Sequence, residues 1–168
     1  MSILIELLPT AGSVLIVGGG NVALRRAAQF SAAGFQLYVV APVVASGFAD
    51  LPNTTVDTRA FQDSDVAGHA LICACTDIRD VNAHVGELAR QHGIPVAVAD
   101  RQEESTFFMP ALHRDGDLLV GVGTGGASPR LAQDVRDRVA SYLGSGWAVR
   151  LDIARQARRE SLNRDKTP

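Results

Sequence analysis

Three glycines near the start of the chain have the spacing of a phosphate-binding turn. Gly18, Gly19 and Gly20 follow the apolar run 14–17 and precede a helical pattern. Gly18, Gly20 and Ala23 match the pattern G-x-G-x-x-G/A. In that pattern the first glycine allows a tight turn, the second lets a pyrophosphate approach the backbone, and the small third residue lets the helix pack on the strand. The spacing therefore predicts a dinucleotide site at a helix N-terminus; the alternative is a glycine-rich turn that binds nothing.

Acidic and hydroxyl side chains follow two further apolar runs. Asp100 follows the run 94–99, and Thr76 and Asp77 follow the run 70–75. The carboxyl ends of parallel strands form the edge where open α/β sheets bind ligands. At that edge Asp100 can take a proton from a bound ligand or order it, whereas Thr76 and Asp77 can contact the cofactor. The alternatives are that Asp100 caps the following loop and that Thr76 and Asp77 cap the next helix.

The end of the second predicted strand indicates which cofactor the chain prefers. A NAD site usually has an acidic residue there that binds the ribose, and a NADP site has a nearby arginine. The strand expected over 36–41 is followed by Pro42, and the next few residues contain neither an acidic residue nor an arginine. We therefore expect backbone groups to hold the adenosine end, with NAD rather than NADP as the cofactor.

A second glycine-rich loop precedes a helix expected over 129–143. It contains Thr124, Gly125, Gly126 and Ser128. Backbone N–H groups in such a loop can bind an anion, and the alternative is a hairpin exit followed by a helix cap. Arg130 is a candidate for pairing with a carboxylate, although single arginines usually lie on the surface.

The elements that would position these residues alternate between strand and helix. We expect strands at 13–18, 36–41, 54–58, 70–75 and 94–99, with helices at 21–33 and 78–92. This alternation favours an α/β fold with a parallel sheet of the Rossmann type. After Asp100 we expect extended segments at 106–112 and 117–123, joined by the turn residues 114–117 into a hairpin. Helices at 129–143 and 147–162 follow, and a disordered tail at 163–168.

Composition excludes several classes of protein. The 168 residues carry a net charge of −2, which offers no broad attraction to nucleic acid. No apolar run reaches the roughly 18 residues of a membrane span, and the first residues lack the basic region of a secretion signal, so we expect a cytoplasmic protein.

Cys73 and Cys75 lie two apart on a predicted strand, which predicts buried thiols rather than a disulfide. The four histidines do not form a metal box, and we expect no permanent metal site.

Five segments together resemble one known family. They are 17–23 with Arg25, 39–42, 74–77 with Asn82, Asp100 with 107–111, and 123–132. In this order and spacing they look like the precorrin-2 dehydrogenase family, which includes the dehydrogenase/ferrochelatase portion of siroheme synthase. The resemblance covers roughly residues 3–145, and the T-G-G-A-S-P segment combined with G-G-G-x-V-A is far more specific than either motif separately.

The resemblance implies an enzyme that oxidises precorrin-2 to sirohydrochlorin with NAD⁺, in siroheme or cobalamin synthesis. Some members also insert Fe²⁺. It implies a NAD-binding Rossmann domain over 1–112, a dimerisation region made of the hairpin and helix over 113–145, and a short helical segment over 146–168. We therefore expect a homodimer. The chain ends earlier than typical members, which predicts an abbreviated helical domain or a truncated chain.

Site residues are carried over by the same resemblance. Asn21 and Val22 match cofactor-contacting positions after the glycines, and Pro42 and Val43 match those after the second strand. Asp100 matches the essential carboxylate of the family. Thr124 aligns with a serine that is phosphorylated in some fused enzymes, and the eight carboxylates of the tetrapyrrole would be partners for its loop. The rival hypothesis is a nucleotide-sensing module on the same fold that catalyses nothing.

Overall fold

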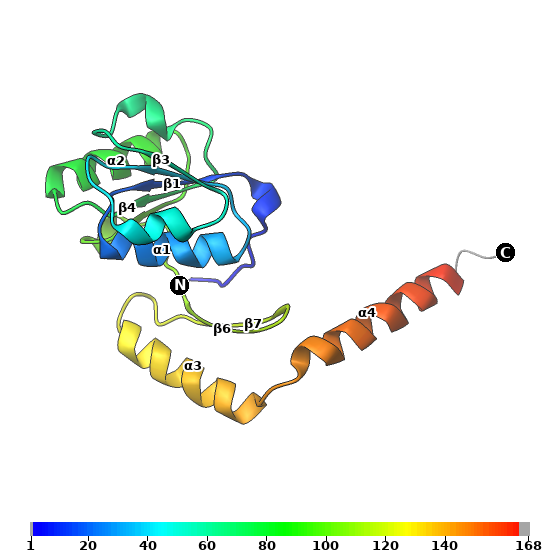
Figure 1. Ribbon diagram of the computed structural model, residues 1–168. Helices are drawn as coiled ribbons and strands as arrows, with labels where there is room; N and C mark the ends of the chain where they lie inside the picture. Colours follow the sequence, from blue (N-terminus) through cyan, green and yellow to red (C-terminus); the bar gives the residue numbers. More distant parts are fainter. Residues whose placement is uncertain (1, 165–168) are drawn as a thin grey trace. The chain divides into compact units, whose positions relative to one another are not determined.

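The computed structural model describes residues 2–164, which divide into two compact units (Figure 1). The first, here called the sheet unit, is Ile5–Phe108. The second, the hairpin unit, combines the residues before Ile5 with those from Met109 onward. Each unit is described by itself.

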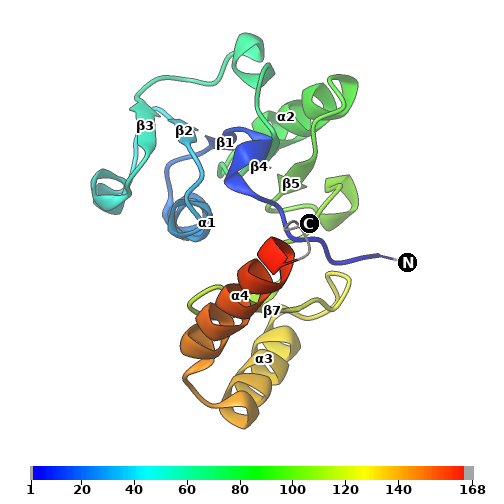
Figure 2. The same ribbon diagram turned by 90° about the vertical axis from the view of Figure 1, so that its right-hand side faces the viewer.

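A parallel sheet forms the centre of the sheet unit, as the alternating pattern predicts. Its strands are β1 (Val14–Val17), β2 (Leu37–Val40), β3 (Thr54–Asp57), β4 (Leu71–Ala74) and β5 (Val96–Val98). They lie in the order β3-β2-β1-β4-β5, which Figure 2 shows from one side to the other. Helices α1 (Asn21–Ala32) and α2 (Arg79–Gln91) cover opposite faces (Figure 1). The α/β fold of the Rossmann type is therefore confirmed.

Strand order and register bring the predicted site segments to one edge of the sheet. The chain runs from β1 to β2 on one side and returns to β4 on the other, so the direction of winding reverses at β1. Val17 is in register with Val40 of β2 and with Ala74 of β4, and Ala74 is in register with Val98 of β5. The residues that follow these four strands consequently lie at the carboxyl edge, where such sheets bind ligands.

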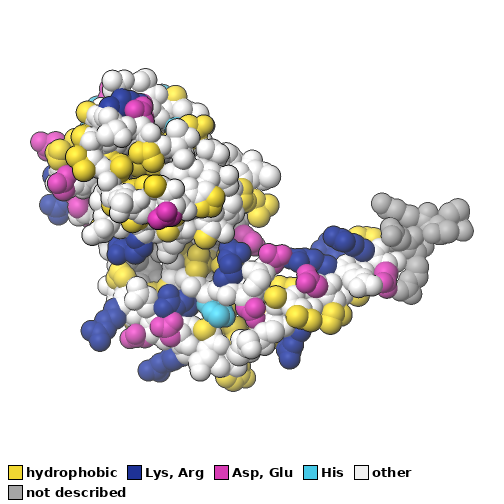
Figure 3. All heavy atoms as spheres, viewed as in Figure 1, with side chains coloured by type: hydrophobic (Ala, Val, Ile, Leu, Met, Phe, Trp, Pro, Cys, Tyr) yellow, Lys and Arg dark blue, Asp and Glu magenta, His cyan; other side chains and the backbone are white. Residues whose placement is uncertain are grey.

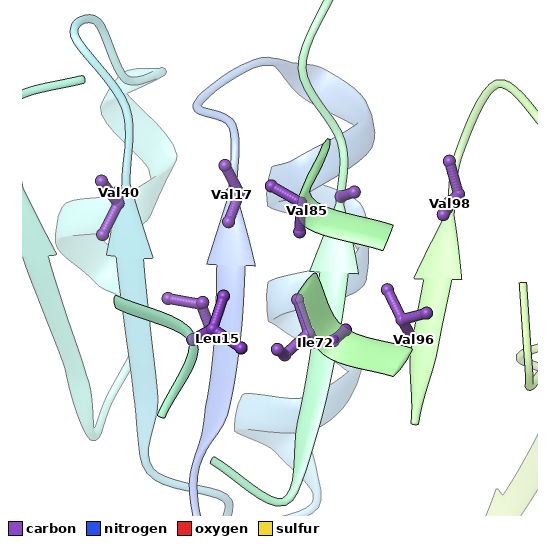
Figure 4. Close-up of a cluster of buried hydrophobic side chains, with 10 residues drawn as sticks. Leu15, Val17, Val40, Ile72, Val85, Val96 and Val98 are labelled. Carbon is purple, nitrogen blue, oxygen red and sulfur yellow. The ribbon is translucent and has the colours of Figure 1, made fainter. Parts of the chain in front are cut away.

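A cluster of aliphatic side chains fills the space between the sheet and α2. Figure 4 shows Leu15, Val17, Ile72, Val96 and Val98 projecting from the strands, with Val85 of α2 above them. All are at most 2% exposed. The strands β1, β4 and β5 are continuous apolar runs because they are covered on both faces, whereas the edge strand β3 has no buried residue.

Truncating the centre of this cluster should destabilise the sheet unit. Ile72 is fully buried on β4, so Ile72→Ala removes three carbons and leaves a cavity. The free energy of unfolding should fall by about 2–5 kcal/mol, measured by urea denaturation followed by circular dichroism. Val43→Ala is the control, because that valine is 80% exposed; equal midpoints for the two variants would contradict this account of the core.

The two cysteines are buried and not bonded to each other, as the sequence predicts. Burial raises the pKa of the Cys73 thiol to about 12 and that of the Cys75 thiol to about 11. Both therefore remain neutral thiols at physiological pH and act as small apolar side chains.

Short 3₁₀ turns complete the sheet unit. They are η1 (Pro9–Ala11), η2 (Ser46–Asp50), η3 (Asp63–Val66) and η4 (Gln102–Glu104). The turn η2 lies between β2 and β3, and η3 lies between β3 and β4.

The hairpin unit contains the predicted hairpin with shorter bounds. Strands β6 (Ala111–Asp115) and β7 (Leu118–Val122) pair antiparallel. The expected four-residue turn 114–117 is wrong, because Arg114 and Asp115 pair with β7 and only Gly116 and Asp117 form the loop. Gly116 has φ +60°, the conformation that glycine supplies at the first position of a type II′ turn.

The start of the first extended segment is also different from the prediction. Residues 106–110 are not part of β6. Instead, the Thr106 N–H donates to the Val96 carbonyl and the Val96 N–H donates to Thr106 Oγ1, both at 2.8 Å. Ser105 accepts the Val98 N–H at 2.9 Å in the same way. Residues 105 and 106 thus satisfy the backbone hydrogen-bonding groups on the outer edge of β5. Local sequence does not predict these bonds, because their partners are seven to ten residues apart.

Two helices follow the hairpin at the predicted places. Ser128 caps α3 (Pro129–Leu143) by accepting the Leu131 N–H at 3.2 Å. Asp115 accepts the Trp147 N–H at 2.8 Å at the start of α4 (Trp147–Arg164), and Arg155 pairs with Asp117. Helix α4 ends at Arg164, two residues beyond the expected end, and residues 165–168 of the expected disordered tail lie outside the described residues.

Apolar side chains remain exposed on α3 and α4. Tyr142 is 91% exposed, and Val149 and Ile153 are 63% and 65% exposed. Figure 3 shows hydrophobic atoms at the surface of α4 among basic and acidic side chains. Of the helices between residues 2 and 164, none has both the length and the apolar composition needed to cross a bilayer.

Candidate dinucleotide site and acidic network

The first two glycines of the turn are required by the protein's own backbone. Gly18 has φ +125°, and a Cβ built on it would lie 2.4 Å from the Cys75 carbonyl oxygen. A Cβ on Gly19 would lie 2.0 Å from the Val43 carbonyl oxygen. The loops that follow β4 and β2 therefore pack directly on the turn, and no larger residue fits at either position.

The third glycine faces open space. Apart from its two chain neighbours, no heavy atom of residues 2–164 lies within 4 Å of a Cβ built on Gly20, and its φ is −82°, which any residue adopts. Folding therefore does not need a glycine here, whereas a ligand that approaches the backbone does. This vacant surface fits the position at which the fingerprint brings the pyrophosphate close to the chain.

The helix that follows can bind an anion. Gly20 is the N-cap of α1, and no side chain within residues 2–164 caps it. The first turn of α1 carries no acidic residue. The first N–H groups of an α-helix have no partner within the helix, and together with the helix dipole they favour a phosphate.

The other predicted cofactor residues lie beside the turn. Asn21 and Val22 are exposed in the first turn of α1, while Ala23 is fully buried, as close packing of the helix on the strand requires. Pro42 and Val43 are exposed in the loop that follows β2, and the Ala45 N–H of that loop donates to the Gly19 carbonyl at 2.8 Å. The residues predicted to contact the cofactor are thus brought together, and contact itself stays a prediction.

Thr76 and Asp77 differ from each other in their surroundings. The Thr76 hydroxyl lies 2.8 Å from Asn82 Oδ1 and accepts the Ile78 N–H at 3.2 Å, so its hydrogen bonds stabilise the turn into α2. Asp77 is exposed at the sheet edge. The suggested capping of α2 by these two residues is wrong in detail, because the N-cap is Ile78, whose side chain makes no capping hydrogen bond.

Asn82 is the central residue of a hydrogen-bond network at this edge. It is 1% exposed. Its Oδ1 accepts the Thr76 N–H at 3.0 Å, and its Nδ2 donates to the Thr76 carbonyl at 3.0 Å and to Asp100 Oδ1 at 2.9 Å. The side chain therefore connects the chain after β4 with the chain after β5.

Sequence reasoning named Asn82 only as part of a family motif and gave it no role. A signal was present, because Asn82, Val85, Gly86 and Ala89 have the spacing of one buried helix face. A polar residue on such a face needs hydrogen-bond partners, since an unpaired buried amide costs about 1–3 kcal/mol.

Asp100 is held by two donors. Arg79 Nη1 donates to its Oδ2 at 2.8 Å, and Asn82 donates to its Oδ1. Arg79 also pairs with Glu104, so one guanidinium joins two carboxylates. Partial burial raises the pKa of the Asp100 carboxyl, but the hydrogen bonds from Arg79 and Asn82 outweigh it and leave the pKa below its usual value. Asp100 is therefore a carboxylate at neutral pH, with 37% of its side chain exposed.

The acid and the glycine turn belong to the same edge of the sheet. The Cys75 N–H donates to the Val17 carbonyl at 2.7 Å, and the Ala99 N–H donates to the Ala74 carbonyl at 2.9 Å. These bonds place the residues after β1, β4 and β5 next to one another. The Asp100 charge is also one of the groups that raise the pKa of Cys75, which itself lies against Gly18.

The second glycine-rich loop, in the hairpin unit, is closed by its own hydrogen bonds. Thr124 Oγ1 accepts the Ser128 N–H at 3.2 Å, and the Ala127 N–H donates to the Thr124 carbonyl at 3.1 Å. Gly125 and Gly126 have φ of +61° and +84°. Arg130 is exposed. This geometry is that of a hairpin exit and helix cap, and binding of an anion there stays a prediction.

Metal-ligating side chains are not gathered anywhere within residues 2–164 in groups of three or more. Of the histidines, His84 lies on the exposed face of α2, where its Nε2 is 2.7 Å from an Asp63 oxygen.

Comparison with known proteins identifies siroheme synthases as relatives of this chain. Siroheme synthase of Methylococcus capsulatus is 40% identical over 147 residues, which cover 86% of this chain and 31% of that protein. Siroheme synthase 2 of Aeromonas salmonicida is 39% identical over 131 residues, covering 77% and 27%. The chain thus spans about a third of the length of the curated relatives it matches.

A solved structure agrees with these relatives. SirC, described as a precorrin-2 dehydrogenase, superposes with a TM-score of 0.73 at 25% identity, covering 93% of this chain and 79% of that one. The resemblance predicted from the sequence motifs is therefore confirmed.

The family model described as "Putative NAD(P)-binding" matches residues 7–111. The match contains the glycine turn, the five parallel strands and Asp100. With a vacant surface over Gly20 and an uncapped helix N-terminus beside it, the chain belongs to this family of NAD(P)-binding domains.

Proposed function

We propose that the chain oxidises precorrin-2 to sirohydrochlorin with NAD⁺ bound at the glycine turn. The observation that carries the proposal is the meeting, at one sheet edge, of the open backbone at Gly20 with the ionised carboxylate of Asp100. The names of the siroheme synthase relatives and of SirC support the choice of substrate. The oxidation would serve siroheme or cobalamin synthesis.

The chemistry divides between cofactor and protein. When bound, the nicotinamide ring supplies a hydride acceptor. Gly20 and the first N–H groups of α1 hold the pyrophosphate, with Asn21, Val22, Pro42, Val43 and Asp77 proposed as further contacts. Asp100 accepts or orders the proton that the macrocycle loses, which needs a carboxylate within hydrogen-bond reach of that proton.

We propose NAD rather than NADP as the cofactor. The loop after β2 contains Pro42 and Val43, with neither an acid to bind the ribose nor an arginine to bind a 2′-phosphate in the next few residues. Backbone groups would then hold the adenosine end. Calorimetric titration with both cofactors tests this, and tighter binding of NADP⁺ would refute it.

Insertion of Fe²⁺ into the product is a second candidate activity. Metallation removes two pyrrole N–H protons, and the ionised Asp100 is proposed to accept them one at a time, releasing the first to solvent before it accepts the second. The hypothesis is tested by adding Fe²⁺ to sirohydrochlorin with and without the protein and following the spectrum of siroheme.

The hairpin unit is proposed to bind substrate and to form a homodimer. In the loop of Thr124, Gly125, Gly126 and Ser128, and at Arg130, we propose contacts with carboxylates of the tetrapyrrole. The exposed Leu131, Val135 and Tyr142 of α3 offer apolar surface for a second copy of the chain. Sedimentation velocity distinguishes a dimer from a monomer.

We propose that the protein works in the cytoplasm. The free thiols of Cys73 and Cys75 are compatible with that reducing compartment.

The decisive experiment is turnover. The full chain is incubated anaerobically with precorrin-2 and NAD⁺, and absorbance is followed for sirohydrochlorin and for NADH. We expect both products to appear in equal amounts. If the protein binds NAD⁺ but produces neither, the rival hypothesis of a nucleotide-sensing module is favoured instead.

A further inference from the structure

We infer that Asn82 and Arg79 are positioning residues that act through Asp100: Asn82 aims its carboxylate, and Arg79, shared with Glu104, keeps it charged. The kinetic part of this inference rests on the proposed function. The electrostatic part concerns the cofactor-free protein and can be tested without any substrate.

Asn82 determines the direction of the carboxylate because it is itself fixed. Its amide is buried and bonded to both backbone groups of Thr76. The remaining Nδ2 hydrogen is directed at Asp100 Oδ1, 2.9 Å away. One oxygen of Asp100 is thereby tied to the strand end that lies beside the glycine turn, so its position relative to a cofactor follows from the sheet rather than from a loop.

Arg79 is the cation that, together with the hydrogen bond from Asn82, stabilises the charged form of Asp100. The charged and titratable groups around Asp100 are Arg79 from α2, Glu104 from η4, and the Cys75 thiol at the end of β4. Cys75 is neutral, since its pKa is about 11. The Arg79 cation favours the charged carboxylate and the neighbouring Glu104 anion opposes it, so this balance acts together with burial and the Asn82 hydrogen bond on how readily Asp100 takes up a proton.

This balance predicts opposite shifts for two substitutions. Arg79→Met removes the cation, so the pKa of Asp100 should rise. Glu104→Gln removes the competing anion and leaves Arg79 to Asp100, so the pKa of Asp100 should fall further. If Arg79 and Glu104 served packing alone, the two substitutions would not shift the pKa of Asp100 in opposite directions.

The test is a carbon-13 NMR titration of the Asp100 carboxyl in the cofactor-free protein. The midpoint should move to higher pH in Arg79→Met and to lower pH in Glu104→Gln. Arg90→Met is the matched control, because Arg90 also lies on α2 and donates to the Glu104 carbonyl at 2.9 Å but pairs with Glu87; its midpoint should equal that of the unaltered protein. An unchanged midpoint in both Arg79→Met and Glu104→Gln would overturn the role of Arg79.

The same shifts should appear in turnover. The active form is the carboxylate, so activity is lost as pH falls through the Asp100 pKa. A depressed pKa puts this loss at low pH, and Arg79→Met should therefore move the acidic limb of the kcat profile to higher pH. If the NMR shifts occur while no variant, nor the unaltered chain, turns over precorrin-2, the proposed function fails and the electrostatic inference stands.

Asn82→Asp tests the aiming role. The variant keeps the shape of the side chain but loses the Nδ2 donor and puts a second acid beside Asp100. We expect kcat to fall about 10²-fold, as for a catalytic group displaced by about 1 Å, with the KM for NAD⁺ little changed. Asn82→Ser, which retains a hydroxyl donor, replaces it if the aspartate variant does not fold. A folded variant with the kcat of the unaltered chain would overturn this role.

Discussion

Asp100→Asn should reduce the oxidation of precorrin-2 by roughly 10²–10⁴-fold, the usual contribution of a general base. The amide cannot accept the substrate proton, yet its oxygen can still receive the bond from Asn82 that now ends on Asp100 Oδ1. We therefore expect kcat to fall while the thermal midpoint changes little. Formation of sirohydrochlorin at saturating substrate and NAD⁺ is the measurement.

Glu103→Gln is the matched control for this substitution. Glu103 lies three residues after Asp100, with a side chain that is 71% exposed. The same change of charge at this position should leave kcat within about twofold of the unaltered chain. Normal turnover in a folded Asp100→Asn variant would remove Asp100 from the mechanism.

Gly20→Ala should weaken NAD⁺ binding at least about tenfold, which corresponds to about 1.4 kcal/mol. A methyl group at this position meets no atom of residues 2–164 within 4 Å, so the fold should tolerate it. It would, however, occupy the surface that the pyrophosphate approaches. Isothermal titration calorimetry gives the affinity, and circular dichroism confirms that the variant is folded.

Two other substitutions serve as controls for Gly20→Ala. Gly19→Ala puts its Cβ 2.0 Å from the Val43 carbonyl oxygen and should therefore destabilise the protein itself. Gln29→Ala, on the exposed side of α1, should leave both stability and affinity unchanged. An unimpaired affinity in Gly20→Ala would mean that the dinucleotide does not lie over this turn.

The strands could be predicted because each leaves a local signal. Residues 14–17, 37–40 and 71–74 are continuous apolar runs, and each strand of a covered parallel sheet must be apolar on both faces. Helix ends were marked in the same local way, with Ser128 capping α3 as expected. The bounds differ by one or two residues, as helix and strand ends commonly do.

The errors arose where a distant segment competes with local preference. Thr106 was expected to start a hairpin strand, but its backbone and hydroxyl satisfy the edge of β5. Arg114 and Asp115 were expected in a turn, but pairing with β7 extends the strand over them. In each case hydrogen bonds to another strand, β5 for Thr106 and β7 for Arg114 and Asp115, outweigh the local preference.

The amino-acid sequence by itself determined the order of strands and helices, the glycine turn and the position of an acid after the fifth strand, because these depend on spacing and on patterns that extend over a few residues. Only the tertiary structure decided that Gly18 and Gly19 serve packing while Gly20 is left open, and that Asn82 and Arg79 hold Asp100. Those contacts join residues 18 to 57 positions apart, and such distances in sequence carry no local signal until the parallel pairing of the strands brings their carboxyl ends to a common edge.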